Sequence, residues 1–160
     1  MSRIKLPHDS QNFQGGGTTF INNFSKAINK YGHEIVEGDN FDIFFIAGAT
    51  LASHDEVIKV KEQGKKIILR VDNILEDGKN RNTGMPRLRE FANLADIIVY
   101  QSDWARRLLS PMLGNGVVIY NGVDTDIFYP RVEPKNWDNI RVFYSRWGRG
   151  EGKNFNVVQY

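Results

Sequence analysis

Short apolar runs alternate with segments of helical periodicity along most of this 160-residue chain. When strands and helices alternate in this way, the strands pair in parallel and the connecting helices pack on the sheet. The predicted strands are Arg3–Pro7, Glu34–Val36, Asp42–Ala47, Lys66–Val71, Ile97–Tyr100 and Val117–Tyr120. We therefore expect an α/β fold, with a doubly wound parallel sheet and helices on both faces. The run Asp42–Ala47 is almost entirely apolar, so this strand is expected to be buried on both sides.

Segments with amphipathic helical spacing separate these strands and carry start or stop signals. The predicted helices are Thr18–Tyr31, Ser53–Gln63, Met85–Leu94 and Ser102–Ser110. Ser53 and Glu56 form a capping box, and Ser102 is the predicted cap of the last helix. Gly32 and Gly64 are predicted to end the first two helices.

Composition excludes several classes of protein. The chain has no cysteine, which excludes a disulfide scaffold and a thiolate metal site and fits a reducing cytosol. Its formal charge of +2 is too small to argue for nucleic-acid binding. Met1–Pro7 lacks the apolar core of a signal peptide, and the most apolar window, Phe41–Ala52, is short and contains Asp42. We expect a cytoplasmic protein without a membrane span.

The stretch Val117–Pro130, VVIYNGVDTDIFYP, has the composition of a strand that leads out of a domain. Its first four residues are apolar and stop at Asn121 and Gly122, two residue types that tolerate a sharp turn. Pro130 and Pro134 keep the following segment extended and disfavour a helix. The sequence therefore predicts a buried strand followed by a crossing into a second domain.

In residue types and order, this stretch resembles the interdomain linker of the family-four retaining glycosyltransferases with the GT-B fold. Those proteins carry Asn-Gly-Val-Asp, an aromatic residue and a proline between two Rossmann-like halves. Asp96 before a predicted strand and Ser102 after it resemble a second pattern of the family. Trp104, close to Ser102, is expected to be a packing residue. The resemblance implies a Rossmann-like acceptor-side domain at 1–120, a linker at 121–139 and the first strand-loop-helix of a donor-side domain at 140–160.

The resemblance also implies a function. Such an enzyme transfers a sugar from a nucleotide-sugar donor to an acceptor with retention, without a metal or a further cofactor. The implied acceptor is a glycan, a lipid-linked molecule or another small molecule, and peripheral contact with the inner face of the membrane would suit it. Family members hold the donor with two glutamates deep in the second domain. These two positions lie further along the domain than the part that residues 140–160 match. We expect the isolated chain to be inactive and expect further sequence or a second chain to supply the donor-side domain.

The residues alone leave a second functional class open. A Rossmann-like module with no catalytic activity, which binds a ligand or docks a partner protein, would have the same alternation of strands and helices. The discriminating feature is a donor-side domain, encoded downstream or carried by a partner.

Three glycines, Gly15, Gly16 and Gly17, stand directly before the first predicted helix. Backbone N–H groups at a helix N-terminus, with no side chains in the way, suit a phosphate, whereas the alternative is a tight turn that needs positive φ. Gly15 and Gly17 also fit a dinucleotide-binding fingerprint, but Phe20 occupies its third glycine position and argues against it. By resemblance, Gly16 and Gly17 lie near the donor diphosphate.

Arg70, Asp72 and Asn73 stand at the carboxyl end of the predicted strand Lys66–Val71, where open α/β sheets bind ligands. Arg70 is suited to hold a phosphate or carboxylate, and Asp72 to accept a hydrogen bond from a sugar hydroxyl. Relatives carry a similar string in the cleft, so the resemblance implies that these three residues contact the acceptor. The alternative for Asp72 is a turn cap.

Arg146 and Lys153 follow another predicted strand, Ile140–Tyr144. The family places an Arg and a Lys on this loop, where positive charge offsets the charge that the leaving diphosphate gains in the transition state. Arg146 matches the first and Lys153 the second, while Arg149 competes for the role. The alternative is a pair of solvated cations.

No metal site is predicted. Asp124 and Asp126 form an Asp-x-Asp string, which binds divalent metal in another glycosyltransferase fold. Here the string lies inside the linker pattern, so its carboxylates are expected to cap turns. His8, His33 and His54 have no metal-ligand spacing, and His8 is expected to be a surface histidine.

Overall fold

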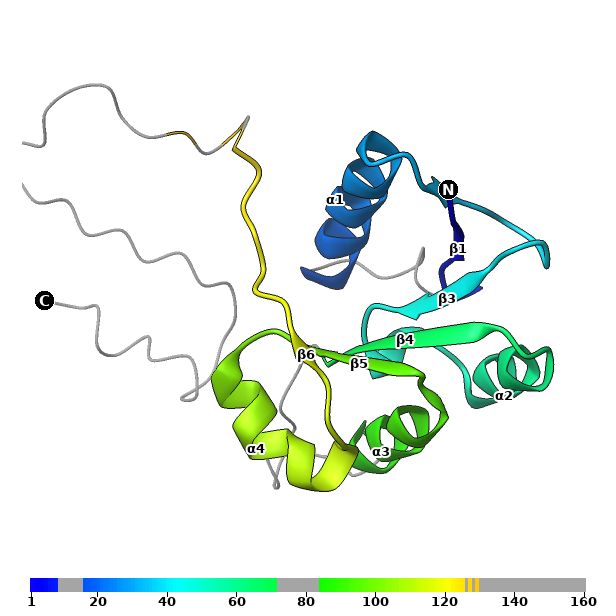
Figure 1. The fold of residues 1–160 in the computed structure, drawn as a ribbon, viewed down its shortest axis with the longest axis vertical. Coiled ribbons are helices and arrows are strands. Elements are labelled where there is room, and N and C mark those ends of the chain that lie inside the picture. Colours follow the sequence, from blue (N-terminus) through cyan, green and yellow to red (C-terminus); the bar gives the residue numbers. More distant parts are fainter. Residues whose placement is uncertain (9–15, 72–83, 126, 128, 130–160) are drawn as a thin grey trace, which may run out of the picture. The chain divides into compact units, whose positions relative to one another are not determined.

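The computed structural model contains a parallel sheet with helices on both of its faces (Figure 1). It describes residues 1–8, 16–71, 84–125, 127 and 129. The contacts between Cα atoms divide the chain into two units, Met1–Asp124 and Thr125–Tyr160, and every element named below belongs to the first. The predicted α/β class and doubly wound parallel sheet are confirmed.

The strands of the described residues are β1 Arg3–Lys5, β2 Glu34–Ile35, β3 Ile43–Ile46, β4 Lys66–Val71, β5 Ile97–Tyr100 and β6 Val117–Val118. The helices are α1 Gly16–Lys30, the 3-10 helix η2 Ala49–Leu51, α2 His54–Glu62, α3 Gly84–Leu94 and α4 Asp103–Leu113. The sheet order is β2-β1-β3-β4-β5-β6, and every neighbouring pair is parallel. The direction in which strands are added reverses between β1 and β3, so the topological switch point lies there.

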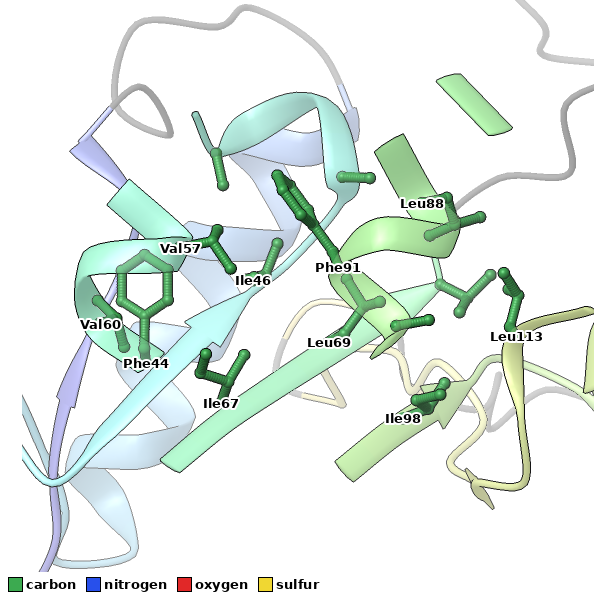
Figure 2. Close-up of a cluster of buried hydrophobic side chains, with 14 of the residues drawn as sticks. Phe44, Ile46, Val57, Val60, Ile67, Leu69, Leu88, Phe91, Ile98 and Leu113 are labelled. Atoms are coloured by element: carbon green, nitrogen blue, oxygen red, sulfur yellow. The ribbon is translucent and has the colours of Figure 1, made fainter. Parts of the chain in front are cut away.

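Side chains that alternate along the central strands belong to two apolar clusters, one on each face of the sheet. Phe44 and Ile46 of β3 point into the larger cluster, which α2, α3 and α4 cover (Figure 2). Phe45 of β3 points to the opposite face and packs in the smaller cluster under α1. All three side chains are buried, so the prediction that this strand is covered on both sides is confirmed.

Stacked phenyl rings join α1 to the sheet. Phe24 of α1 lies 4.4 Å from Phe45, measured between ring centroids, and Phe20 lies 5.9 Å from Phe24 and 6.3 Å from Phe45. In a dinucleotide-binding fold a glycine at the position of Phe20 lets the helix approach the strand closely. Phe20 fills that interface with an aromatic ring instead, as the departure from the fingerprint indicated.

Serine side chains cap the two helices for which the sequence predicted them. The Ser53 hydroxyl accepts a hydrogen bond from the Glu56 N–H at 3.3 Å, and Ser102 accepts one from the Ala105 N–H at 3.1 Å. Each bond satisfies one of the backbone donors that have no partner within the first helical turn. Both predicted caps are confirmed.

Glycines in the left-handed region end α1 and α2, as predicted. Gly32 has φ 77° and Gly64 has φ 68°. After α1 the His33 N–H donates to the Ile28 carbonyl at 3.0 Å, the long bond of a Schellman motif, and the bond from Lys65 repeats it after α2. These endings turn the chain back toward the sheet for β2 and β4.

Two helix boundaries differ from the prediction by more than one residue. α1 begins at Gly16 rather than Thr18, because apolar periodicity starts only at Phe20 and does not mark an exposed first turn. α4 continues past Ser110 to Leu113, through Pro111. Proline removes one backbone hydrogen bond, but the buried side chain of Leu113 holds this last turn on the core.

A strand does form within the predicted range Val117–Tyr120, as β6, but the prediction that it is buried is wrong. Among the residues that the structure describes, β6 pairs over two residues, and its partner is β5. Val117 is 49% exposed and Tyr120 is 64% exposed. An apolar run indicates a strand, but it does not reveal that the strand is the last one in the described part of the sheet.

The loop before β6 lies so close to β5 that position 116 requires glycine. A Cβ atom on Gly116 would stand 2.3 Å from the Ile98 carbonyl oxygen and 2.9 Å from Cε2 of Tyr100. The Tyr100 hydroxyl donates to the Gly114 carbonyl at 2.7 Å and holds the same loop. Its burial raises the pKa of Tyr100, so this donor keeps its proton at neutral pH.

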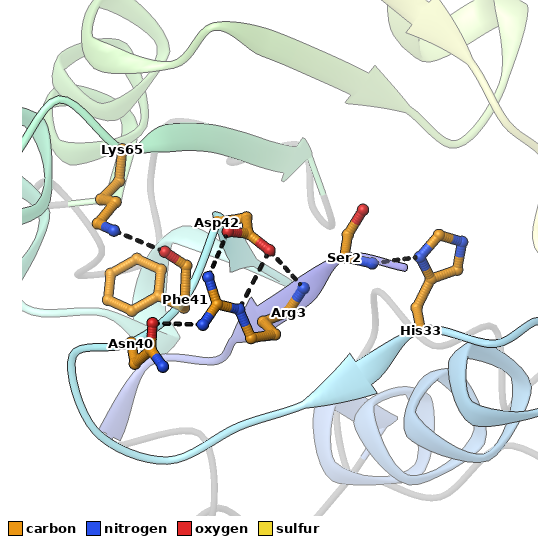
Figure 3. Close-up of polar contacts among 7 residues, drawn as sticks. All are labelled: Ser2, Arg3, His33, Asn40, Phe41, Asp42 and Lys65. Carbon is orange, nitrogen blue, oxygen red and sulfur yellow. Dashed lines mark hydrogen bonds and ion pairs between the residues drawn. The ribbon is translucent and has the colours of Figure 1, made fainter.

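A polar network closes the amino edge of the sheet (Figure 3). The Arg3 guanidinium pairs with Asp42 at 2.9 Å and donates to Asn40, while the Arg3 N–H donates to Asp42 at 2.8 Å. Lys65 donates to the Phe41 carbonyl at 2.7 Å. The contacts of Arg3 join β1 to the segment directly before β3. The bond from Lys65 joins that segment to the residue before β4.

We predict that the pairing of Asp42 with Arg3 makes the fold sensitive to acid. Hydrogen bonds from the side chain and backbone of Arg3 lower the pKa of Asp42 from 3.8 to about 2. The stabilisation is therefore present above the unfolded pKa and is lost as the pH falls through the folded value. Urea midpoints should be lower for Asp42→Asn than for the native chain at pH 7, with the difference shrinking toward pH 2. Arg3→Gln should show the same trend, and a difference that stays constant with pH would contradict this account.

Candidate functional site

The carboxyl ends of the strands bring polar side chains together at one edge of the sheet. Arg70 lies near the end of β4, Gln101 follows β5, and Asn121 follows the short strand β6. α1 also begins at this edge, after β1. Open α/β sheets bind ligands beyond the carboxyl ends of their strands, which makes this edge the candidate site.

Arg70 is buried, with 9% of its surface exposed, and its contacts join three parts of the fold. Its guanidinium carbon lies 3.9 Å from the centroid of the Phe20 ring on α1. Nη1 donates to the Ala47 carbonyl at 2.9 Å, directly after β3, and Nη2 donates to Oδ1 of Asn121 at 3.2 Å. The planar, multidentate guanidinium suits such a junction, whereas an ammonium group has no flat face to stack on the ring.

Two further hydrogen bonds extend this junction along the edge. Nδ2 of Asn121 donates to Oε1 of Gln101 at 2.6 Å, and Nε2 of Gln101 donates to the Val71 carbonyl at 2.8 Å. We call Arg70, Gln101 and Asn121 the Arg70 network. It links the ends of β3, β4 and β5 with the segment that leaves β6.

The network assigns Arg70 a contact pattern that the sequence did not predict. The sequence indicated a guanidinium held ready for a phosphate or carboxylate, whereas both Nη atoms donate to groups of the protein. Gln101 and Asn121 were not singled out as site residues. The signal that could have found them is their position, because each is the first polar residue after a strand of the same parallel sheet.

Gly16 and Gly17 form the first turn of α1 rather than a loop before it. Gly17 is exposed, and it is not among the described glycines with positive φ. A Cβ atom there would lie 3.5 Å from Leu51, an ordinary contact, so neither sterics nor φ demands glycine at this position. A glycine there places no side chain of its own over the first-turn N–H groups, which lack intrahelical partners. The tight-turn alternative does not describe Gly17.

The electrostatics of α1 also differ from those of its neighbours. The first turn of α1 has no acidic side chain, whereas α2 carries Asp55 and Glu56 there and α4 carries Asp103. Within the described part of the chain, the buried hydroxyl Oγ1 of Thr18 has no hydrogen-bond partner. Acidic residues at a helix N-terminus oppose a bound anion, so α1 is better suited to one than α2 or α4.

Several predicted site residues lie outside the described residues: Gly15, Asp72, Asn73, Asp126, Arg146 and Lys153. Their predicted roles stay predictions. Among the residues that the structure does describe, no group of three His, Asp or Glu side chains is placed to hold a metal ion. In the same part of the chain, no helix is long and apolar enough to cross a membrane.

The pattern formed by Asp96 and Ser102 has a structural explanation. The Asp96 carboxylate accepts a hydrogen bond from the Ile67 N–H at 2.9 Å, which is the main cause of its lowered pKa and joins β4 to the start of β5. Ser102 caps α4. Trp104, which was expected to be a packing residue, has 60% of its surface exposed.

In comparisons with known proteins, no family model matches the chain and no curated protein matches it.

We predict that Arg70→Lys destabilises the fold although it keeps the charge. Lysine cannot reproduce the two directed bonds and the ring contact, so the loss should be about 1–3 kcal/mol in the free energy of unfolding, measured in urea. Arg89→Lys, at an exposed position on α3, is the matched control and should change stability by less than about 0.5 kcal/mol. Equal effects at the two positions would show that Arg70 has no special structural role.

Proposed function

We propose that this chain supplies the acceptor-side half of a retaining glycosyltransferase that uses a nucleotide-sugar donor. The observation that carries the proposal is the position of Asn121. It is the first residue of the linker-like string Asn-Gly-Val-Asp, and it is also the residue that Arg70 and Gln101 hold at the carboxyl edge of the sheet. The segment that would lead to a donor-side domain therefore starts at the edge where a ligand of this sheet is expected.

In the proposed reaction the bond between the sugar anomeric carbon and the donor phosphate oxygen breaks. A new bond forms between that carbon and an acceptor oxygen on the same face, the proton of the acceptor hydroxyl passes to an oxygen of the departing diphosphate, and nucleoside diphosphate leaves. Negative charge grows on the diphosphate, so groups that meet it with positive potential lower the barrier. We assign this role to the first-turn N–H groups of Gly16 and Gly17, together with Arg146 and Lys153.

Arg70 contributes to this proposal as a positioning residue. Its bonds to protein groups set the end of β4, and Asp72 and Asn73 follow that end directly in the sequence. We assign those two residues to the acceptor, as hydrogen-bond partners of its hydroxyl groups. Residues 140–160 would provide the first strand-loop-helix of the donor-side domain, and activity would need the rest of that domain from further sequence or a second chain.

The proposal predicts a weak anion site at the start of α1. Titration of the isotope-labelled chain with inorganic phosphate and then uridine diphosphate should shift the amide signals of Gly17 and Thr18. Gly17→Val should abolish the shifts because its branched side chain covers the N–H groups, while Gly17→Ala should keep the fold and weaken them less. The first turn of α2, with Asp55 and Glu56, is the internal control and should not respond.

A second experiment tests catalysis by following the transfer of a labelled sugar. The 160-residue chain should transfer no label from nucleotide sugars, and a fusion in which a donor-side domain of a family-four glycosyltransferase follows residue 139 should transfer label in a Gly17-dependent way. Turnover by the chain alone would contradict the need for a donor-side domain. Absence of both anion shifts and transfer by a folded fusion would leave the non-catalytic module as the better account.

A further inference from the structure

Two Asn-Gly pairs flank the short strand β6. Asn115 and Gly116 precede the strand, Asn121 and Gly122 follow it, and a valine comes next in both cases. In an Asn-Gly pair the backbone nitrogen of the glycine can attack the side-chain carbonyl of the asparagine, because glycine has no Cβ that hinders the approach. Since the reacting residues are the same at both sites, a difference in their rates reports on the fold.

The fold holds the first pair tightly. A Cβ atom on Gly116 would stand 2.3 Å from the Ile98 carbonyl oxygen, so the backbone there packs directly against β5. The Gly114 carbonyl, one residue before the pair, accepts the hydrogen bond from the Tyr100 hydroxyl at 2.7 Å. The Gly116 nitrogen can reach the side chain of Asn115 only if the backbone rotates out of these contacts, which requires local opening.

The second pair is exposed and has open space around it. Asn121 and Gly122 are both exposed and belong to no helix or strand. Apart from its chain neighbours, a Cβ atom on Gly122 would have none of the described atoms within 4 Å. The Gly122 nitrogen can therefore move toward the Asn121 side chain without displacing a packed neighbour.

The Arg70 network prepares the carboxamide of Asn121 for attack. Nη2 of Arg70 donates to Oδ1 of Asn121 at 3.2 Å. When a nitrogen adds to Cγ, negative charge develops on Oδ1, and a cationic donor that already stands at this oxygen stabilises the charge. The two Asn-Gly pairs therefore differ in the freedom of the glycine and also in the polarisation of the asparagine.

We propose that Asn121 is a site of spontaneous deamidation and that Arg70 promotes the reaction. The Gly122 nitrogen loses its proton and bonds to Cγ of Asn121, the bond from Cγ to Nδ2 breaks, and Nδ2 leaves with that proton as ammonia. The product is a cyclic imide. Water then opens the ring at either of its two carbonyl carbons and leaves aspartate or isoaspartate at position 121. The net reaction is hydrolysis of a carboxamide to a carboxylate, and it does not depend on the glycosyl transfer proposed above.

Deamidation would change the partners of position 121. A carboxylate has acceptors only, so it would strengthen the bond from Arg70, whereas the bond from Nδ2 of Asn121 to Oε1 of Gln101, 2.6 Å long in the native chain, would be lost. Isoaspartate would also add one methylene to the backbone where the chain leaves β6. The reaction would therefore turn a neutral partner of Arg70 into a charged one and release the segment after β6 from the residue that follows β5.

Mass spectrometry of the 160-residue chain tests the proposal. The native chain and a sample unfolded in urea are incubated in the same mildly alkaline buffer and digested with trypsin. Asn115 and Asn121 both lie between Arg107 and Arg131, so fragmentation of one peptide reports the gain of mass at each site. In urea the two sites should react at rates within about twofold of each other, whereas in the native chain Asn121 should react at least ~tenfold faster than Asn115. Asn121 should also react at least as fast in the native chain as in urea, because only the native chain places Arg70 at Oδ1.

Two variants separate the role of the glycine from that of the arginine. Gly122→Ala should slow the reaction at Asn121 by at least ~tenfold, because its methyl group hinders the attacking nitrogen, while the open space at this position keeps the fold and the rate at Asn115 unchanged. Arg70→Met should slow the reaction at Asn121 by at least ~threefold in the native chain and should not change it in urea. The rate at Asn115 monitors the fold of this variant, because opening of the loop before β6 would raise it.

Three results would overturn the proposal. The first is equal modification of Asn115 and Asn121 in the native chain. The second is a slower reaction at Asn121 in the native chain than in urea, which would show that the Arg70 network protects the carboxamide. The third is an Arg70→Met variant in which Asn115 stays protected and Asn121 reacts at the native rate, which would show that Arg70 takes no part in the reaction.

Discussion

The carboxyl edge of this sheet depends on how one buried guanidinium is satisfied. A charged group with little exposed surface is costly unless acceptors and polarisable groups surround it. Arg70 meets this requirement with the Ala47 carbonyl, the Asn121 side chain and the face of Phe20. Because these partners follow β3, follow β6 and belong to α1, satisfying one side chain constrains three elements at once.

The two edges of the sheet are built differently. At the amino edge Arg3 and Asp42 are half exposed and join adjacent parts of the fold as an ion pair. At the carboxyl edge the Arg70 network uses neutral amides and carbonyls around a single buried cation. Another acceptor can replace the neutral amide of Asn121 as a partner of Arg70, and the displaced amide leaves no unpaired charge behind. This property suits an edge where a ligand is expected.

Much of the fold follows from local signals in the sequence. β4 and β5 have the predicted bounds, and the caps at Ser53 and Ser102 were readable because a serine hydroxyl pairs with an N–H only three residues away. Apolar periodicity reports which residues prefer burial but not which neighbours are present. It therefore missed that β6 is the last strand in the described part of the sheet and that the side chain of Trp104 on α4 is exposed.

The candidate site was predictable in its location and not in its bonding. The rule for ligand sites in parallel sheets pointed to Arg70 because it stands near the end of β4. Its partners come from elements 23 and 51 residues away in the chain, and their choice depends on side-chain geometry across the sheet. No local pattern encodes such pairs, so Asn121 was recognised as part of a linker-like string and not as the acceptor for Arg70.

A double-mutant cycle between Arg70 and Asn121 tests the central claim most directly. Arg70→Met, Asn121→Ala and the double variant are compared with the native chain by urea denaturation. If Arg70 holds the start of the exit segment, the two substitutions should be coupled by at least about 0.5 kcal/mol in the free energy of unfolding. Additive effects would show that the segment after β6 is held at the carboxyl edge by something other than Arg70.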